Sequence, residues 1–428
     1  MAFSRVMALP AATRPASGNP WRVAGVVLGA LLWMVFIALT FRQSRFPVIF
    51  HRYSKEYAGL LLVVLAGAII VTVAQLPRVF PILYARRHAL LWLLVFCPLL
   101  IFTSVETAMR LFNLLGSDFY SEIRRYMSVL VLDDHLSFKN PVLYRASYKS
   151  VKIVTNELGL RERPLKPHAA GETRILVLGD SVAFGWGVNM EDAVPRQLER
   201  VLQASQNGTV ETINSGVPGY NTNQELTFLE MYGPRLQPDV ALLLYVDNDI
   251  DAIDPARVHL GVLPNPRKDP RGAADYFMSR SRFYFLLSHI LPVVLGSATA
   301  SPDDRRRTAG WQQSMQSLHE MARICRDRGI PLAVFHFRMI DDPISRALNA
   351  DLETRARADG FSFSDTSPWF AGQNIRQLTN SFVDTHPNAE GHRILADGMA
   401  HVLLERGIVG AVFAPPNSLS SRNTGSLK

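Results

Sequence analysis

Apolar residues follow two different patterns along the chain, and the change between them divides it into two parts. Long apolar runs occupy residues 23–41, 57–76 and 89–105, and none of the three contains a charged residue. After about Arg174, short apolar runs alternate with charged, polar and turn-forming residues. An uncharged run of about 20 residues is long enough to cross a bilayer as a helix. The pattern therefore predicts three membrane-spanning helices followed by a globular domain.

The globular part alternates β-rich apolar runs with amphipathic segments of helical length, which is typical of a parallel sheet covered on both faces. Residues 392–405, for example, place Leu395, Met399 and Leu403 on one helical face. The predicted strands are residues 174–178, 210–213, 240–246, 332–337 and 361–364, and the clearest helices are residues 193–204, 311–328 and 392–405. We expect an α/β fold with about five parallel strands.

The remaining segments set the predicted domain boundaries. Residues 283–296 are apolar but interrupted by His289 and Pro292, so we expect an amphipathic or buried helix there. Residues from 415 onward are rich in Ser, Asn and Gly and are expected to be disordered. The predicted parts are an N-terminal tail (1–22), a membrane anchor (23–110), a juxtamembrane connector (111–172), a catalytic domain (173–410) and a C-terminal tail (411–428).

The distribution of charged residues bears on the expected binding partners but does not decide the orientation of the protein in a membrane. The net charge is +8, but the basic residues are spread between the membrane flanks and mixed surfaces such as residues 303–307, so a nucleic-acid partner is not expected. Cations on the two sides of the apolar runs nearly balance, so the positive-inside rule does not decide the orientation. An odd number of spans would place the N-terminus and the globular domain on opposite sides. The two cysteines, Cys97 and Cys325, predict neither a disulfide nor a metal site.

Candidate chemistry gathers where the predicted strands end, which is where ligands bind in open parallel sheets. The first strand runs into Gly179-Asp180-Ser181, so the Ser181 hydroxyl would lie at a strand end beside a helix start. The second strand is followed by residues 214–219, whose glycines let a backbone N–H approach a substrate oxygen, and the third is followed by Asn248. Together, these groups could form an oxyanion hole. Each of them alone has a plainer interpretation, as a helix cap or a turn.

A base for Ser181 is supplied near the end of the chain. His386 lies between the last predicted strand and the last helix, and Asp384 precedes it by two residues. A histidine can take the serine proton, and an aspartate can hold the ring in the correct tautomer. Taken alone, a histidine before a proline at a helix start is a capping or surface residue. The coincidence of all the groups favours a catalytic serine.

The acidic loop after the third strand was tested as a calcium site. Counted from Asp247, the sixth position is Ala252, where the EF-hand needs glycine, and the twelfth is Val258, where it needs glutamate. Neither a metal nor another cofactor is expected.

Four blocks, in order, resemble those of the SGNH or GDSL-type hydrolases: residues 179–181, 214–219, 248–249 and His386. The resemblance covers about residues 174–406. It implies a flavodoxin-like three-layer sandwich, Ser181 as nucleophile, and the Ser181 N–H, the Gly219 N–H and the Asn248 side chain as oxyanion donors.

Two positions depart from the family's pattern. Val246 stands where the third block usually has glycine, and Asp384 precedes His386 by two residues instead of three. Asp384 is the expected triad acid, and Asp365 is the conceivable substitute. Residues 156–161 also look like a segment that precedes such domains in membrane-anchored bacterial members. That likeness implies an inner-membrane protein with its C-terminal domain outside the cytoplasm.

The sequence therefore predicts a membrane-anchored serine esterase that cleaves acyl groups from a small-molecule, lipid or glycan ester. If a sugar hydroxyl replaced water as the second nucleophile, the same site would act as an O-acyltransferase on envelope glycans. A third hypothesis is a binding module that keeps the fold without turnover.

Overall fold

The computed structural model describes residues 20–41, 53, 55–83, 97–113, 116–149, 151–205, 209–250, 281–285 and 308–410. The chain forms two compact units. The first comprises Met1–Ser117 with Ser281–Leu287, and the second comprises Asp118–Arg280 with Ser288–Lys428. The predicted C-terminal tail lies outside the described residues.

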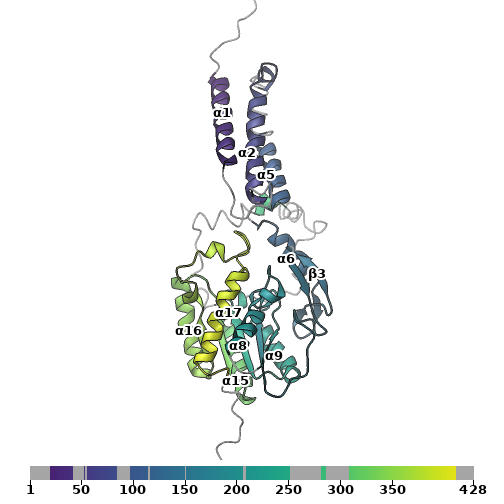
Figure 1. The fold of residues 1–428 in the computed structure, drawn as a ribbon, viewed down its shortest axis with the longest axis vertical. Coiled ribbons are helices and arrows are strands. Elements are labelled where there is room, and N and C mark those ends of the chain that lie inside the picture. Colours follow the sequence, from purple (N-terminus) through teal and green to yellow (C-terminus); the bar gives the residue numbers. More distant parts are fainter. Residues whose placement is uncertain are drawn as a thin grey trace, which may run out of the picture. The chain divides into compact units, whose positions relative to one another are not determined.

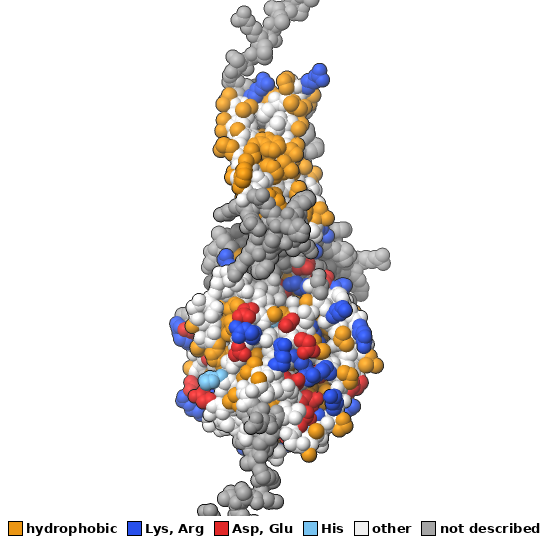
Figure 2. Space-filling view, in the orientation of Figure 1, with side chains coloured by type: hydrophobic (Ala, Val, Ile, Leu, Met, Phe, Trp, Pro, Cys, Tyr) orange, Lys and Arg blue, Asp and Glu red, His pale blue; other side chains and the backbone are white. Residues whose placement is uncertain are grey.

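The first unit is helical and exposes apolar side chains. Its helices are α1 (Pro20–Thr40), α2 (Lys55–Ala74), α3 (Phe80–Leu83), α5 (Cys97–Phe112) and α12 (Arg282–Phe285). The indole N–H of Trp33 donates to Thr72 Oγ1 at 3.0 Å and joins α1 to α2. Trp21–Thr40 and Tyr57–Ala74 each have a mean hydropathy of 2.5 and are long enough to cross a membrane. Figure 2 shows the apolar side chains that cover these helices.

The third predicted span is not supported. Of residues 89–105, the structure describes 97–105 within α5, which continues to Phe112 and includes Glu106 and Arg110. Among the described helices, two and not three are long and apolar enough to span a bilayer. The described part of the apolar run, residues 97–105, forms only the first part of the 16-residue helix α5, whose second half carries charged residues. With two candidate spans among the described helices, an odd number of spans no longer places the N-terminus and the globular domain on opposite sides.

The second unit contains the predicted parallel sheet (Figure 1). Its strands are ordered β6-β5-β7-β8-β9, and every neighbouring pair is parallel. The α/β prediction is confirmed, and each predicted strand is present within two residues at either end. The strands are β5 (Glu172–Gly179), β6 (Thr209–Asn214), β7 (Val240–Tyr245), β8 (Leu332–His336) and β9 (Ser362–Asp365).

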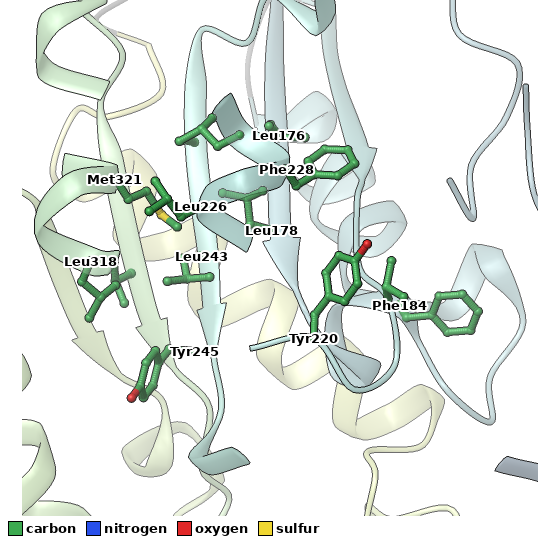
Figure 3. Close-up of a cluster of buried hydrophobic side chains, with 14 of the residues drawn as sticks. Leu176, Leu178, Phe184, Tyr220, Leu226, Phe228, Leu243, Tyr245, Leu318 and Met321 are labelled. Carbon is green, nitrogen blue, oxygen red and sulfur yellow. The ribbon is translucent and has the colours of Figure 1, made fainter. Parts of the chain in front are cut away.

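Helices cover both faces of this sheet, because successive strand residues point to opposite sides. Leu176 and Leu178 of β5 pack on the same side as α9 and α15, as Figure 3 shows. Ile175 and Val177 pack on the other side, against α8 and α17. The long helices are α8 (Val194–Ser205), α9 (Thr222–Leu236), α15 (Ala309–Asp327), α16 (Pro343–Asp359) and α17 (Ala389–Glu405). Short helices are α7 (Ser181–Phe184), η3 (Met190–Asp192), η4 (Asp247–Ile250), η6 (Ser367–Phe370) and η7 (Ile375–Gln377).

Much of the predicted connector is part of the second unit. It forms α6 (Phe119–Met127), the hairpin β1 (Val131–Asp133) and β2 (Ser137–Lys139), and the hairpin β3 (Arg145–Tyr148) and β4 (Val151–Val154). Seven of its buried side chains lie in the same apolar cluster as the sheet: Tyr126, Leu130, Leu136, Phe138, Tyr148, Ile153 and Leu160. The connector is therefore a packed layer of the unit. Of the apolar segment predicted at residues 283–296, only the end of α12 is described.

Candidate active site

Ser181 lies at the carboxyl end of β5, the second strand of the sheet order. A Cβ at Gly179 would lie 2.7 Å from the Cβ of Ala183 and 3.2 Å from the carbonyl oxygen of Leu244, so only glycine fits there. The Asp180 side chain caps α7 by accepting the Val182 N–H at 2.9 Å. A strand that turns this abruptly into a helix leaves Ser181 at the strand end, with 7% of its surface exposed.

The structure brings Ser181, His386 and Asp384 together. The distance from Ser181 Oγ to His386 Nε2 is 2.8 Å, and the distance from His386 Nδ1 to Asp384 Oδ1 is 2.7 Å. A proton on Nδ1 donates to the carboxylate and leaves the Nε2 lone pair to accept the serine proton. These contacts suit nucleophilic attack by a serine.

Hydrogen bonds within the loop that carries His386 fix its shape before α17 begins. The Asn380 N–H donates to the His386 carbonyl oxygen at 2.9 Å, and Thr379 and Pro387 form an isolated bridge. Asn388 then caps α17 by accepting the Glu390 and Gly391 N–H groups. Because both ends of the loop are fixed, the imidazole has a defined position over Ser181.

Asp384, and not Asp365, contacts the imidazole. Asp384 is completely buried, and Asn380 Nδ2 also donates to it at 3.3 Å. Burial raises the pKa of the Asp384 carboxyl, but the hydrogen bond and charge of His386 and the charge of Lys149 outweigh it and hold the pKa below its usual value. Asp365, at the end of β9, instead accepts bonds from the Ser367 N–H and hydroxyl.

The second block lies against the nucleophile helix. A Cβ at Gly216 would lie 2.3 Å from the backbone nitrogen of Phe184, and the Val217 N–H donates to the Gly179 carbonyl oxygen at 3.2 Å. Gly219 follows with φ +87°, a conformation that favours glycine. In the described part of the chain, the N–H groups of Ser181 and Gly219 donate to no protein group. Both amides are thus available to a substrate oxygen.

Asn248 is held by the residue that precedes the nucleophile. Its Nδ2 donates to Asp180 Oδ2 at 3.0 Å, and the same carboxylate oxygen lies 3.1 Å from Ser181 Oγ. A primary amide has two N–H groups, so one remains when the other is bound. Val246, the departure in this block, follows the end of β7 and donates its N–H to Asp249 Oδ2 at 3.0 Å. That departure does not prevent Asn248 from reaching the site.

A buried guanidinium holds the loop that follows Ser181. Arg161 is completely buried and donates to the carbonyl oxygens of Phe184, Gly185 and Val188. Burial lowers the pKa of Arg161 to about 10, which leaves it charged at neutral pH. The segment 156–161 was noticed in the sequence, but its contact with this loop could not be inferred from it.

Two apolar side chains of α6 lie at the site, and sequence reasoning missed both. The ring centroids of Phe119 and His386 are 5.6 Å apart, and a Cβ at Gly219 would lie 3.2 Å from Met127 Cε. Nothing in the local sequence of α6 marks these residues, because the contacts depend on how the connector folds back. The helix borders both the base and the second block.

Comparison with known proteins identifies the family. The family model of the GDSL-like lipase/acylhydrolase family matches residues 177–394. The chain belongs to this family. It is accordingly an ester-cleaving hydrolase, and its substrates are acyl esters.

Solved structures with a similar fold include two enzymes of low sequence identity. One is the psychrotrophic esterase EstA from Pseudoalteromonas sp., with 14% identity and a TM-score of 0.36, covering 55% of this chain and 98% of that one. Another is a GDSL-like lipase from Bacteroides thetaiotaomicron, with 16% identity and a TM-score of 0.32, covering 58% of this chain and 93% of that one. No curated protein matches the chain. The family assignment rests on the family model.

Proposed function

We propose that this protein is a membrane-anchored serine esterase that uses Ser181, His386 and Asp384 as its catalytic triad. The observation that carries the proposal is the continuous hydrogen-bonded chain from Ser181 Oγ through the imidazole of His386 to Asp384. A series of hydrogen-bonded side chains of this kind suits general-base activation of a serine.

In the proposed reaction, Ser181 Oγ attacks the ester carbonyl carbon while its proton passes to His386 Nε2. Asp384 stabilises the imidazolium, which then gives the proton to the departing alcohol. Water attacks the resulting acyl-enzyme, His386 takes the water proton, and the acid is released as Ser181 regains its hydrogen. In each half of the reaction, His386 first accepts a proton as a base and then donates it as an acid.

The oxyanion of each tetrahedral intermediate would be bound by the N–H groups of Ser181 and Gly219 and by the second N–H of Asn248. Support comes from the two amides that no described protein group uses and from the bond between Asn248 and Asp180, which orients the amide. Removing one such donor costs about 10²–10³-fold in turnover in other serine hydrolases.

Membrane anchoring is supported by the two apolar helices, and a location of the hydrolase outside the cytoplasm rests on the likeness to anchored bacterial members. A reporter that is active only in the cytoplasm, or only outside it, can be fused at Lys428 to test on which side of the membrane the C-terminus lies. A cytoplasmic C-terminus would exclude cell-envelope substrates.

A fluorophosphonate probe, which phosphorylates an activated serine, tests the triad without knowledge of the substrate. We expect the full chain in detergent to be labelled, and Ser181→Ala and His386→Ala to lose labelling and at least about 10³-fold of their ester hydrolysis. Ser364→Ala is the matched control, because its hydroxyl is buried on β9 and contacts no described partner. A folded wild type that is not labelled would overturn the proposal in favour of a binding module.

Hydrolysis and acyl transfer are separated by their products. An esterase releases the free acid from p-nitrophenyl acetate whether or not a glycan is present. A transferase would instead acylate the added glycan, which mass spectrometry detects.

A further inference from the structure

The hairpin β3–β4 brings a lysine from the connector to the triad acid. Lys149 lies at the turn of this hairpin, between the paired residues Tyr148 and Val151. Its ammonium contacts Asp384 Oδ2. The lysine side chain is 11% exposed and the aspartate side chain is fully buried, so the pair is largely removed from water. Ion pairs shielded in this way interact more strongly than pairs on the surface.

The two oxygens of the Asp384 carboxylate have different partners. Oδ1 accepts from His386 Nδ1 at 2.7 Å, whereas Oδ2 contacts Lys149 and accepts from Asn380 at 3.3 Å. A carboxylate held at both oxygens cannot rotate about its terminal bond. The imidazole that donates to Oδ1 therefore has an acceptor in a fixed position.

The lysine itself is held in place by α6. Its backbone N–H donates to Glu122 Oε2 at 3.0 Å, and its ammonium lies 5.8 Å from the ring centroid of Phe119. The same ring lies beside His386, with 5.6 Å between centroids. Two elements of the connector thus meet at the triad.

We propose that Lys149 is a positioning residue of the ester-cleaving site, which fixes the carboxylate of Asp384 and, by its charge, disfavours a proton resting on His386. The proposal rests on the proposed function of the triad. No block of the family resemblance includes this residue.

The sign of the electrostatic effect follows from the arrangement of charges. A positive charge beside Asp384 offsets part of the negative charge that stabilises the imidazolium. Removing the lysine charge leaves that negative charge unopposed, so we expect the acid limb of the activity profile to move upward in a variant without the lysine.

The other charged groups around the pair do not replace this charge. Glu122 is paired with Arg125 at 2.7 Å, and burial lowers the pKa of His392 to about 3, so His392 is neutral throughout the relevant range. Asp180 Oδ2 lies 3.1 Å from Ser181 Oγ, and this residue is present in every variant compared. Asp384 and Glu122 contact Lys149, and His386 contacts Asp384. The next charged or titratable groups are Arg125, Asp180, His392 and Arg161.

The test compares fluorophosphonate labelling rates of the full chain between pH 4 and pH 9. We expect Lys149→Met to move the midpoint of the acid limb upward by about one pH unit and to lower the maximal rate about tenfold. Lys149→Gln, which keeps a hydrogen-bond donor without the charge, serves if Lys149→Met does not fold. Lys149→Arg should restore the wild-type midpoint.

Lys152→Met is the matched control. It removes the same charge from the same hairpin, at an exposed position of β4. Its midpoint should equal that of the wild type. A midpoint that is unmoved in both charge-removing variants at Lys149 would overturn the proposal, even if the rate fell, because a merely structural role lowers the rate at every pH.

A second readout separates this proposal from the function on which it rests. Carbon-13 NMR of the histidine Cε1 atoms follows the proton on His386 directly, with its signal assigned by its loss in His386→Ala. An upward shift in Lys149→Met without any labelling of the wild type would refute the esterase mechanism and keep the role of Lys149. Labelling of the wild type with an unmoved NMR midpoint would refute the role of Lys149 alone.

Discussion

The carboxylate of Asp384 is an anion without solvent contact, and its partners explain how it persists. His386, Asn380 and Lys149 all reach it, and their combined effect keeps its pKa low in spite of burial. An unpaired carboxylate in such a place would take up a proton instead. The charge that orients the histidine is therefore stabilised by two segments of the chain, the loop that carries Asn380 and His386 and the hairpin that carries Lys149.

Replacing this carboxylate by an amide should separate the two candidate acids. We expect Asp384→Asn to lower kcat for p-nitrophenyl acetate by about 10³-fold, because an amide does not hold the required tautomer. Asp365→Asn removes the same charge at the end of β9 and should change kcat less than about threefold. Equal losses in the two variants would refute the assignment of Asp384.

Individual residues were predictable where several weak signals agreed. Ser181, Gly219, Asn248 and His386 each follow a strand or precede a helix, so topology alone brings them to one edge of the sheet. The two-residue spacing from Asp384 to His386 left the acid open, because spacing does not show which way a loop turns. Lys149 carries no local signal, since its role arises from a contact between residues 235 positions apart.

Among the elements, the loop after α7 depends on a cation that has no carboxylate partner in the described structure. Arg161 is held by backbone carbonyl oxygens and by the ring of Phe184, whose centroid lies 4.9 Å from the guanidinium carbon. The planar guanidinium can serve several acceptors at once, which a lysine ammonium in the same place does not do. The element that presents Ser181 is thus fixed from the connector.

Removing this guanidinium should loosen the second unit. We expect Arg161→Leu to reduce stability by about 3 kcal/mol, because it leaves buried carbonyl groups unpaired, and to lower the midpoint of thermal unfolding by about 9 °C. Arg163→Leu is the control: its side chain is 50% exposed and pairs with Glu199, so a fall of less than about 3 °C is expected. Differential scanning fluorimetry of the full chain in detergent measures both unfolding midpoints. Similar shifts in the two variants would contradict a special role of Arg161 in holding the loop.

The three inner strands, β5, β7 and β8, were predictable as elements because they are nearly continuous apolar runs, which is typical of parallel strands buried on both faces. The two hairpins of the connector were not predicted. Their strands are three or four residues long and half exposed, so they lack a continuous apolar run. Their order comes from packing on the rest of the unit.

At the scale of the whole molecule, the compact hydrolase unit is larger than the segment that the family model matches. The match begins at residue 177, whereas the compact unit begins at Asp118. Large side chains between these positions, including Tyr126, Phe138 and Tyr148, lie in the core cluster that contains Leu176. Each buried side chain of this size contributes about 1.5–3 kcal/mol, so a few of them equal the stability of an ordinary domain.

Two truncated chains test where the functional unit begins. A chain starting at Asp118 should fold and be labelled by the fluorophosphonate probe, because it keeps the complete core cluster. A chain starting at Ala169 should aggregate or remain unlabelled, although it keeps the whole family match. Gel filtration and labelling measure both, and a folded, labelled shorter chain would show that the connector is dispensable.

The apolar helices of the first unit show the limit of reading hydropathy alone. Apolar length identified α1 and α2, but the third run was assigned as one span even though its described helix continues to Glu106 and Arg110. A run of apolar letters does not reveal where a helix starts. The orientation of the protein consequently stays a prediction.

Lys149 occupies the hairpin turn with φ +50°, a backbone conformation that lysine adopts at a cost and that asparagine or glycine adopts readily. Asn or Gly at this turn would relieve the backbone cost but would leave the buried carboxylate of Asp384 without its ammonium partner, which costs more. The strained lysine is therefore kept by its ion pair, and a library of this protein screened by turnover should retain it.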